Sequence, residues 1–175
     1  EAGVARALCG GPGQIRLARE AGMRVSGDYG LNVLNSIALR ELGKMGAEDV
    51  TLSFENNLRQ GAALGDYLPF GVIGYGYLPL MTFRVCPAQV PGGCGRCRGE
   101  AFLTDRLGKK FPVVCRGRRY SQLLNTVPLY LGDKQGTLEG FCHVTLRFTT
   151  ESRGTDSTTR ISMVVGSTGT TSTCS

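Results

Sequence analysis

Short apolar runs alternate with segments of helical spacing over the first half of the chain. Strand-like runs occupy residues 4–11, 23–33, 49–55 and 69–83, and helical patterns occupy residues 13–22, 35–47 and 57–66. Alternation of strands and helices with short links predicts parallel strands joined by crossovers. With only three or four strands visible, the pattern fits half of a (β/α) barrel or a small open sheet.

The clearest helix covers residues 35–47. Asn35 or Ser36 can cap its start, and Gly46 ends it. The spacing of four apolar residues predicts a mostly buried face, made by Ile37, Leu39, Leu42 and Met45.

The pattern changes at Cys86. Residues 101–116 form two strand-like runs around Leu107 and Gly108, which predicts a hairpin. Residues 121–133 fit a short extended or helical piece, and alternating apolar residues in 139–151 predict a last strand. Residues 152–175 are mostly Ser, Thr and Gly, a composition that cannot bury a core, so we expect a disordered tail.

The net charge of the chain is concentrated in one segment. The 175 residues carry 20 basic and 14 acidic side chains, a net of +6, and the whole surplus lies in residues 96–119. Such a basic cluster attracts polyanions or anionic small molecules, and the alternative is a solvated surface loop. The single histidine excludes sites built from several histidines, and no apolar run reaches the length of a membrane span.

Four of the seven cysteines lie within or beside the basic segment. They follow the pattern C-x7-C-x2-C-x17-C, at Cys86, Cys94, Cys97 and Cys115. The loop 86–97 is rich in Pro and Gly and can aim three thiolates at one point, while the fourth comes from the far strand of the predicted hairpin. Four thiolates suit zinc or an iron–sulfur cluster, and the nearby arginines help to balance their negative charge.

The cysteine spacing alone favours neither zinc nor an iron–sulfur cluster over the other. Disulfides are a third alternative, disfavoured because nothing marks the chain as secreted. Of the other cysteines, we expect Cys9 and Cys142 in or near the core and give Cys174 in the tail no role. Reduced thiolates fit a reducing compartment, so we expect a cytoplasmic protein.

Six motifs follow one another in order along the chain. They are GDYGLNVLNS (27–36), VTLSFE (50–55), LPLMTFRVCP (78–87), GCGRC (93–97), LTDRLGKKFPVVC (103–115) and LLNTVPLYL (123–131). Together they resemble the bacterial collagenase-like peptidase family U32 over roughly residues 1–150. The resemblance implies an α/β chain: the C-terminal half of a (β/α)8-type barrel over 1–85, then a cysteine-rich β segment over 86–151 that binds the cluster. It also implies that the chain is a piece of a longer protein and lacks the N-terminal half of its barrel.

The same resemblance implies an activity. The family includes collagenase-like proteases, and also oxygen-independent hydroxylases of tRNA, ribosomal RNA or ubiquinone that carry a 4Fe–4S cluster on four cysteines. It therefore favours iron–sulfur over zinc, with Cys86, Cys94, Cys97 and Cys115 as ligands. The favoured function is hydroxylation of RNA bases or a small acceptor without oxygen, with RNA or an anionic small molecule bound through residues 96–119. The alternatives are a collagenase-like protease acting on peptides and a non-catalytic, zinc-stabilised nucleic-acid-binding module.

Candidate functional side chains follow the predicted strands, because barrel enzymes carry their functional groups at the C-terminal strand ends. Asp28 and Glu55 could accept a proton, bind a cation or orient a substrate, and they are the candidate catalytic residues. The candidate substrate-binding residues are Asn32, Tyr75, Tyr77 and Arg84. The structural alternatives are a cap or loop hydrogen bond for Asp28 and a core position for the tyrosines.

Proteolysis by a familiar mechanism has little support in the sequence. No H-E-x-x-H or G-x-S-x-G motif occurs, and His143 lies in the predicted last strand, remote from any recognisable nucleophile motif. We therefore interpret His143 as structural.

Overall fold

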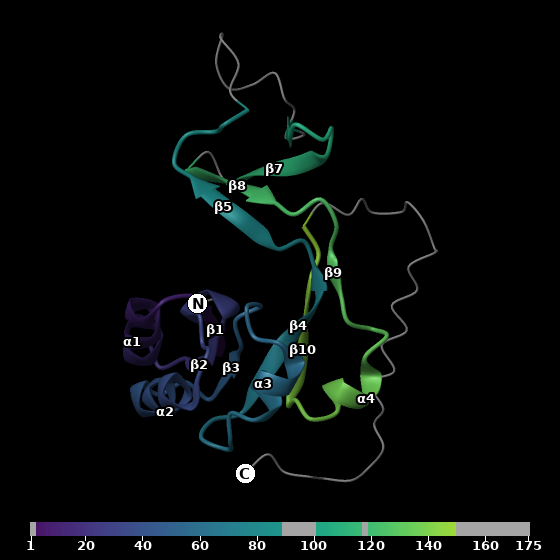
Figure 1. The fold of residues 1–175 in the computed structure, drawn as a ribbon. Coiled ribbons are helices and arrows are strands. Elements are labelled where there is room, and N and C mark those ends of the chain that lie inside the picture. The colour runs from purple at the N-terminus through teal and green to yellow at the C-terminus, as the bar shows by residue number, and fades with distance from the viewer. Residues whose placement is uncertain (1–2, 89–100, 117–118, 150–175) are drawn as a thin grey trace. The chain divides into compact units, whose positions relative to one another are not determined.

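The computed structural model describes residues 3–88, 101–116 and 119–149 (Figure 1). These residues divide into two compact units. Of the described residues, the first unit contains the chain up to Gly74 together with Leu131–Leu146, and the second contains Tyr75–Tyr130 together with residues 147–149. The tail predicted over 152–175 lies outside the described residues.

The first unit is built on a sheet whose first four strands run in chain order. Its elements are β1 (Arg6–Cys9), α1 (Pro12–Glu20), β2 (Arg24–Gly27), the 3-10 helix η1 (Tyr29–Leu31), α2 (Ser36–Met45), β3 (Asp49–Thr51), α3 (Leu58–Ala62), β4 (Phe70–Gly76), α4 (Gln135–Leu138) and β10 (His143–Arg147). The sheet has the order β1-β2-β3-β4-β10. The pairs β1–β2, β2–β3 and β3–β4 are parallel, as the alternation of strands and helices predicted.

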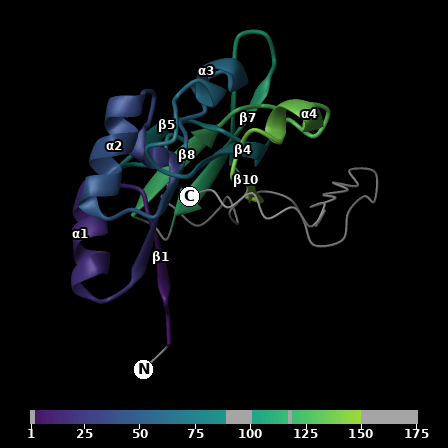
Figure 2. The same cartoon turned by 90° about the horizontal axis from the view of Figure 1, so that it is seen from below.

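The helices start where the sequence supplies caps. The Asn35 side chain accepts a hydrogen bond from Ala38 N at 2.9 Å, and α2 ends at Gly46, as predicted. Asn57 and Gln60 form a reciprocal capping box at α3. Helices α1 and α2 lie side by side in both views (Figures 1 and 2).

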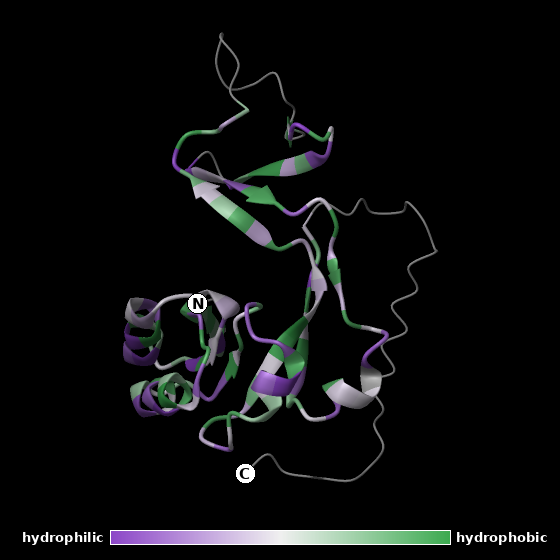
Figure 3. Ribbon diagram, viewed as in Figure 1, coloured by the Kyte–Doolittle hydropathy of each residue, from purple (hydrophilic) through white to green (hydrophobic). Residues whose placement is uncertain are grey.

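The core of the first unit lies between these helices and the sheet. Ile15, Leu39, Val25 and Val50 are each 0–1% exposed, and Figure 3 shows hydrophobic residues concentrated along β4. The predicted buried face of α2 is partly wrong, because Ile37 is 63% exposed. Residues two apart are about 200° apart around a helix, so Ile37 and Leu39 point in nearly opposite directions.

The predicted half barrel is wrong. The described residues form ten strands in two sheets with four short α-helices, and five of the ten strands pair only in the antiparallel direction. After β4 the chain enters a separate antiparallel sheet before β10, preceded by the one-turn helix α4, lies next to β4. Strand β9 (Leu129–Tyr130) pairs with the end of β4 in the antiparallel direction. In a (β/α)8 barrel each strand would have parallel neighbours on both sides.

Glycines in β4 explain how β10 comes so close. A Cβ atom at Gly71 would collide with His143, and one at Gly74 would collide with Val144. A glycine inside a strand often marks the close approach of another backbone. The apolar run of β4 predicted burial, and all of its residues are buried, but the run says nothing about the direction of its neighbours.

The second unit contains a four-stranded antiparallel sheet in the order β5-β8-β7-β6. Its strands are β5 (Pro79–Phe83), β6 (Ala101–Thr104), β7 (Lys110–Arg116) and β8 (Tyr120–Leu124). The predicted hairpin at 101–116 is confirmed: Thr104 pairs with Lys110, and Gly108 adopts a φ of 77° in the turn. The piece predicted over 121–133 is extended, since it contains β8 and β9. No helix of the described ranges is long and apolar enough to cross a membrane.

Candidate functional site

One end of the antiparallel sheet gathers the chain segments that carry the cysteines. Phe83 at the end of β5 and Cys115 near the end of β7 are both paired with the same residue of β8, Ser121. Cys86 follows β5 three residues after Phe83. Since β5 and β7 each run antiparallel to β8, they run in the same direction, and their C-terminal ends reach the same end of the sheet.

The segment between β5 and β6 joins two points at this same end. Strand β6 begins there, because Ala101 pairs with Val113, two residues before Cys115. Cys94 and Cys97 belong to this connecting segment and lie outside the described residues. The topology therefore brings Cys86, Cys115 and both ends of the segment holding the other two predicted ligands to one end of one sheet. We call it the cysteine end.

Neither Cys86 nor Cys115 forms a disulfide with a described cysteine, and Cys86 is half-buried whereas Cys115 is exposed. Within the described ranges, no three His, Cys, Asp or Glu side chains gather closely enough to hold a metal ion. Two of the four predicted ligands fall outside those ranges. The two described thiols have the chemistry that zinc and iron–sulfur clusters require.

Six described basic residues of the antiparallel sheet and its ends separate into two groups. Arg84, Arg116 and Arg119 belong to the cysteine end, whereas Arg106, Lys109 and Lys110 belong to the β6–β7 turn at the opposite end of the sheet. A strand of the length of β7 places the two ends about 20 Å apart. None of these six residues forms an ion pair with a described residue. The carboxylate of Asp105 accepts bonds from the backbone N–H groups of Leu107 and Lys109, each 2.8 Å.

The two candidate catalytic carboxylates lie on neighbouring loops of the first unit. Asp28 follows β2 and Glu55 follows β3, and the rings of the adjacent residues Tyr29 and Phe54 are 5.8 Å apart. Parallel neighbours end at the same edge of a sheet, so this proximity follows from the pairing of β2 with β3. Asp28 is half-buried and accepts a bond from Tyr29 N at 2.9 Å, which makes it the cap of η1. Glu55 is exposed.

The other candidate residues divide between the units. Asn32 ends η1 with a left-handed φ of 52° and is exposed. Tyr75 is buried, and its ring lies 5.3 Å from that of Phe148. Tyr77 is half-buried beyond β4, and Arg84 is exposed one residue after β5. Asp28, Asn32 and Glu55 thus belong to the first unit, whereas Tyr75, Tyr77, Arg84, Cys86 and Cys115 belong to the second.

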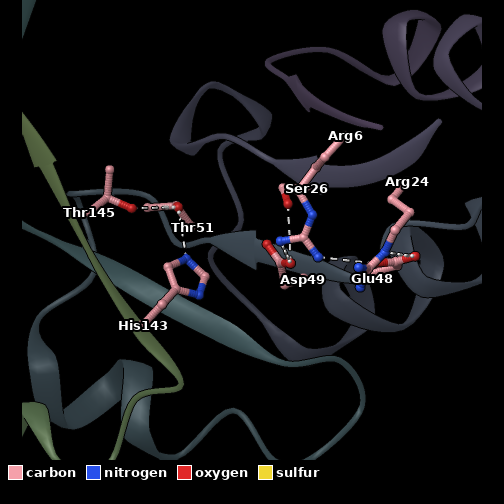
Figure 4. A network of polar contacts seen from close by, with 8 residues as sticks. All are labelled: Arg6, Arg24, Ser26, Glu48, Asp49, Thr51, His143 and Thr145. Carbon is pink, nitrogen blue, oxygen red and sulfur yellow. Dashed lines mark hydrogen bonds and ion pairs between the residues drawn. The ribbon is translucent and has the colours of Figure 1, made fainter. Parts of the chain in front are cut away.

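A polar network in the first unit was not predicted (Figure 4). His143 Nε2 lies 3.1 Å from the Thr51 hydroxyl, which also lies 3.1 Å from the hydroxyl of Thr145. Burial lowers the pKa of His143, the charge of Asp49 raises it and that of Arg6 lowers it further. His143 lies in β10, so its predicted place in the last strand is confirmed.

Beside His143, the network continues as ion pairs. Asp49 accepts a bond from the Ser26 hydroxyl at 3.1 Å and pairs with Arg6 at 3.3 Å. Glu48 pairs with Arg24 at 2.8 Å, and hydrogen bonding from Arg24 lowers the pKa of that carboxyl. The signal in the sequence is the recurrence of polar residues at every second strand position, Arg24 and Ser26 in β2 and Asp49 and Thr51 in β3.

The buried thiol in the first unit is Cys9, which is 2% exposed. Burial raises its pKa, so it stays protonated and unreactive, in agreement with the predicted core position. Cys142, also predicted in or near the core, is exposed.

The resemblance to family U32 rests on the six motifs and remains a prediction. No protein-family model, no curated protein and no solved structure matches the chain.

Proposed function

We propose that Cys86, Cys94, Cys97 and Cys115 bind a 4Fe–4S cluster in an enzyme that hydroxylates RNA bases or a small anionic acceptor without oxygen. The observation that supports it is the shared sheet end: Phe83 and Cys115 both pair with Ser121, and the segment with the other two cysteines starts and ends beside them. Four thiolates are the donor set that such a cluster requires.

The cluster, when bound, would supply electron transfer. The side chains of the protein would hold the cluster and bind the acceptor. The four cysteines hold the cluster. Arg84 and Arg119, which are exposed and make no ion pair to a described residue, bind the phosphate or carboxylate of the acceptor. Four thiolates that hold a cluster require a reducing compartment, and we propose that the protein works in the cytoplasm.

Metal analysis tests the proposal. The full chain is expressed and reconstituted with iron and sulfide without oxygen, and iron, sulfide and zinc per chain are measured with the visible spectrum. The expected result is about four irons per chain with a thiolate-to-iron band. Cys115→Ser should lose the iron, and Cys142→Ser, which changes an exposed cysteine of the first unit, should keep it.

Two outcomes would overturn the iron–sulfur proposal. Stoichiometric zinc without iron in the same preparation would favour the zinc-stabilised nucleic-acid-binding module. Equal metal content in wild type and Cys115→Ser would remove the cysteine end from the site altogether.

The protease alternative has one supporting observation, the contact of Tyr29 with Phe54 that sets the Asp28 and Glu55 loops side by side. Paired carboxylates can activate water for peptide hydrolysis. A protease should lose cleavage of a collagen-like peptide in Asp28→Asn and Glu55→Gln. It should retain cleavage in Asp66→Asn, which changes an exposed carboxylate elsewhere in the first unit. Cleavage that survives the first two substitutions would exclude these residues.

A further inference from the structure

A buried hydroxyl without a partner lies at the cysteine end. Ser121 is 1% exposed, and its Oγ has no hydrogen-bond partner among the described residues. A buried hydroxyl that makes no hydrogen bond costs free energy, so such a group calls for a physical explanation. The other buried serines of the described ranges are in the first unit, and Ser26 and Ser53 both make side-chain hydrogen bonds.

The position of Ser121 in the sheet indicates what its hydroxyl could contact. Ser121 lies directly opposite Cys115 in the antiparallel pair β7–β8, so both side chains are on the same face of the sheet. Cβ atoms of directly opposed residues are about 4.5–5.5 Å apart. A turn of the serine side chain about its Cα–Cβ bond therefore brings Oγ within hydrogen-bonding reach of the Cys115 sulfur.

Among the residues that neighbour Ser121 in the sheet, Cys115 is the acceptor that suits the serine hydroxyl. On the other side of Ser121, the opposed residue is Phe83, whose side chain accepts no such bond. Gln122, the next residue of β8, accepts a bond from Arg116 at 3.3 Å and projects from the opposite face. A protonated thiol is a weak acceptor, whereas a metal-bound thiolate is a good one, because a charged acceptor roughly doubles the strength of the bond.

We propose that Ser121 is a positioning residue that donates a hydrogen bond to the Cys115 sulfur once that sulfur is a metal-bound thiolate. The inference rests on the proposed function and adds the residue that tunes the centre. Hydrogen bonds to cluster sulfurs stabilise negative charge. The reduced cluster carries one negative charge more than the oxidised cluster, so the Ser121 bond raises the reduction potential.

The test compares reduction potentials of the reconstituted full chain. Ser121→Ala removes the donor with almost no change of volume, and Ser121→Thr keeps a hydroxyl. Thr104→Ala is the matched control, because it removes a hydroxyl from the same sheet at the turn end, opposite Lys110. We expect Ser121→Ala to bind the same amount of iron with a lower midpoint potential and a faster loss of iron to a chelator. Ser121→Thr and Thr104→Ala should resemble wild type.

The outcomes separate this inference from the proposal on which it rests. A Ser121→Ala chain with full iron content and the potential of wild type would overturn the role of Ser121 and leave the cluster intact. The same shift in Thr104→Ala would also overturn it, since the effect would then not depend on position. A wild-type chain that binds no iron would overturn both.

Discussion

The two units of the chain use their charges in opposite ways. In the first unit, Arg6 and Arg24 pair with Glu48 at 3.1 and 2.8 Å, and every ion pair between described residues belongs to this unit. The sequence of Tyr75–Tyr130 contains nine basic and two acidic residues, a net of +7, so the rest of the chain has a net of −1. Paired charges stabilise a fold locally, whereas an excess of one sign of charge attracts an anionic ligand.

The units also differ in how much apolar surface they bury. The hydrophobic core cluster consists of residues of the first unit alone, including Ile15, Leu39 and Val50. Buried apolar residues of the second unit are fewer: Tyr75, Val113, Leu123 and Leu124 among those described. A small sheet with a thin core is the kind of structure that a bound metal commonly stabilises.

Removal of a core leucine should produce the largest effect on the first unit. Leu39→Ala should lower the free energy of unfolding by about 2–5 kcal/mol, because Leu39 is fully buried between α2 and the sheet. The control is Ile37→Ala on the same helix, where a 63% exposed side chain should change stability by about 0.5 kcal/mol or less. Denaturant unfolding measures both. Equal effects would contradict the packing of α2.

The same substitution in each unit sharpens the comparison further. Ser26→Ala should destabilise the first unit by about 1–2 kcal/mol, since Ser26 donates a hydrogen bond to the charged Asp49 carboxylate at 3.1 Å and the substitution removes that bond. Ser121→Ala in the metal-free chain should leave stability unchanged or raise it, because the serine hydroxyl has no partner there. Thermal unfolding of both variants checks the difference in sign, and a loss of stability in metal-free Ser121→Ala would contradict it.

The stability of the first unit should depend on pH through His143. Burial lowers the folded-state pKa of His143, whereas the unfolded chain protonates it near its ordinary pKa of about 6.5. As the pH falls below that value, His143 is therefore protonated more fully in the unfolded state than in the folded state. The free energy of unfolding then falls by at most about 1.4 kcal/mol per pH unit. His143→Gln should flatten the dependence of the free energy of unfolding between pH 5 and 7, approximately. Since the chain has one histidine, an unchanged slope would contradict the assignment.

The exposed ion pairs should give the smallest effect. Glu48→Gln removes the partner of Arg6 and Arg24, but all three side chains are at least 40% exposed. Exposed pairs contribute little and are screened by salt. We expect a small loss of stability at low ionic strength that disappears at high ionic strength. A loss that persists in high salt would show that the pairs matter for packing.

Several parts of the fold could be predicted because their signals are local. The cap at Asn35, the helix end at Gly46 and the turn at Gly108 each depend on a few neighbouring residues. The parallel pairing of β1 to β4 follows from the helices between the strands. The approximate burial of β4 follows from its apolar run.

The half barrel failed because strand order is not a local property. The repeats before β4 have the same pattern in a barrel and in an open sheet. Gly71 and Gly74 indicate that a second backbone comes close to β4, since neither residue has a Cβ atom. They do not indicate which strand approaches. Similarly, Asp28 proved to cap η1, although nothing in its spacing separates a cap from a catalytic carboxylate.

The sequence by itself determined the start and end of α2, the hairpin, the basic surplus of residues 96–119 and the set of four closely spaced cysteines, because each depends on residue type and short spacing. Only the tertiary structure decided that β10 lies next to β4, that the basic residues divide between two ends of a sheet, and that Ser121 is buried opposite Cys115. These features depend on pairing between residues distant in the chain. Register, burial and hydrogen-bond partners are set by such pairings, and no local pattern contains them.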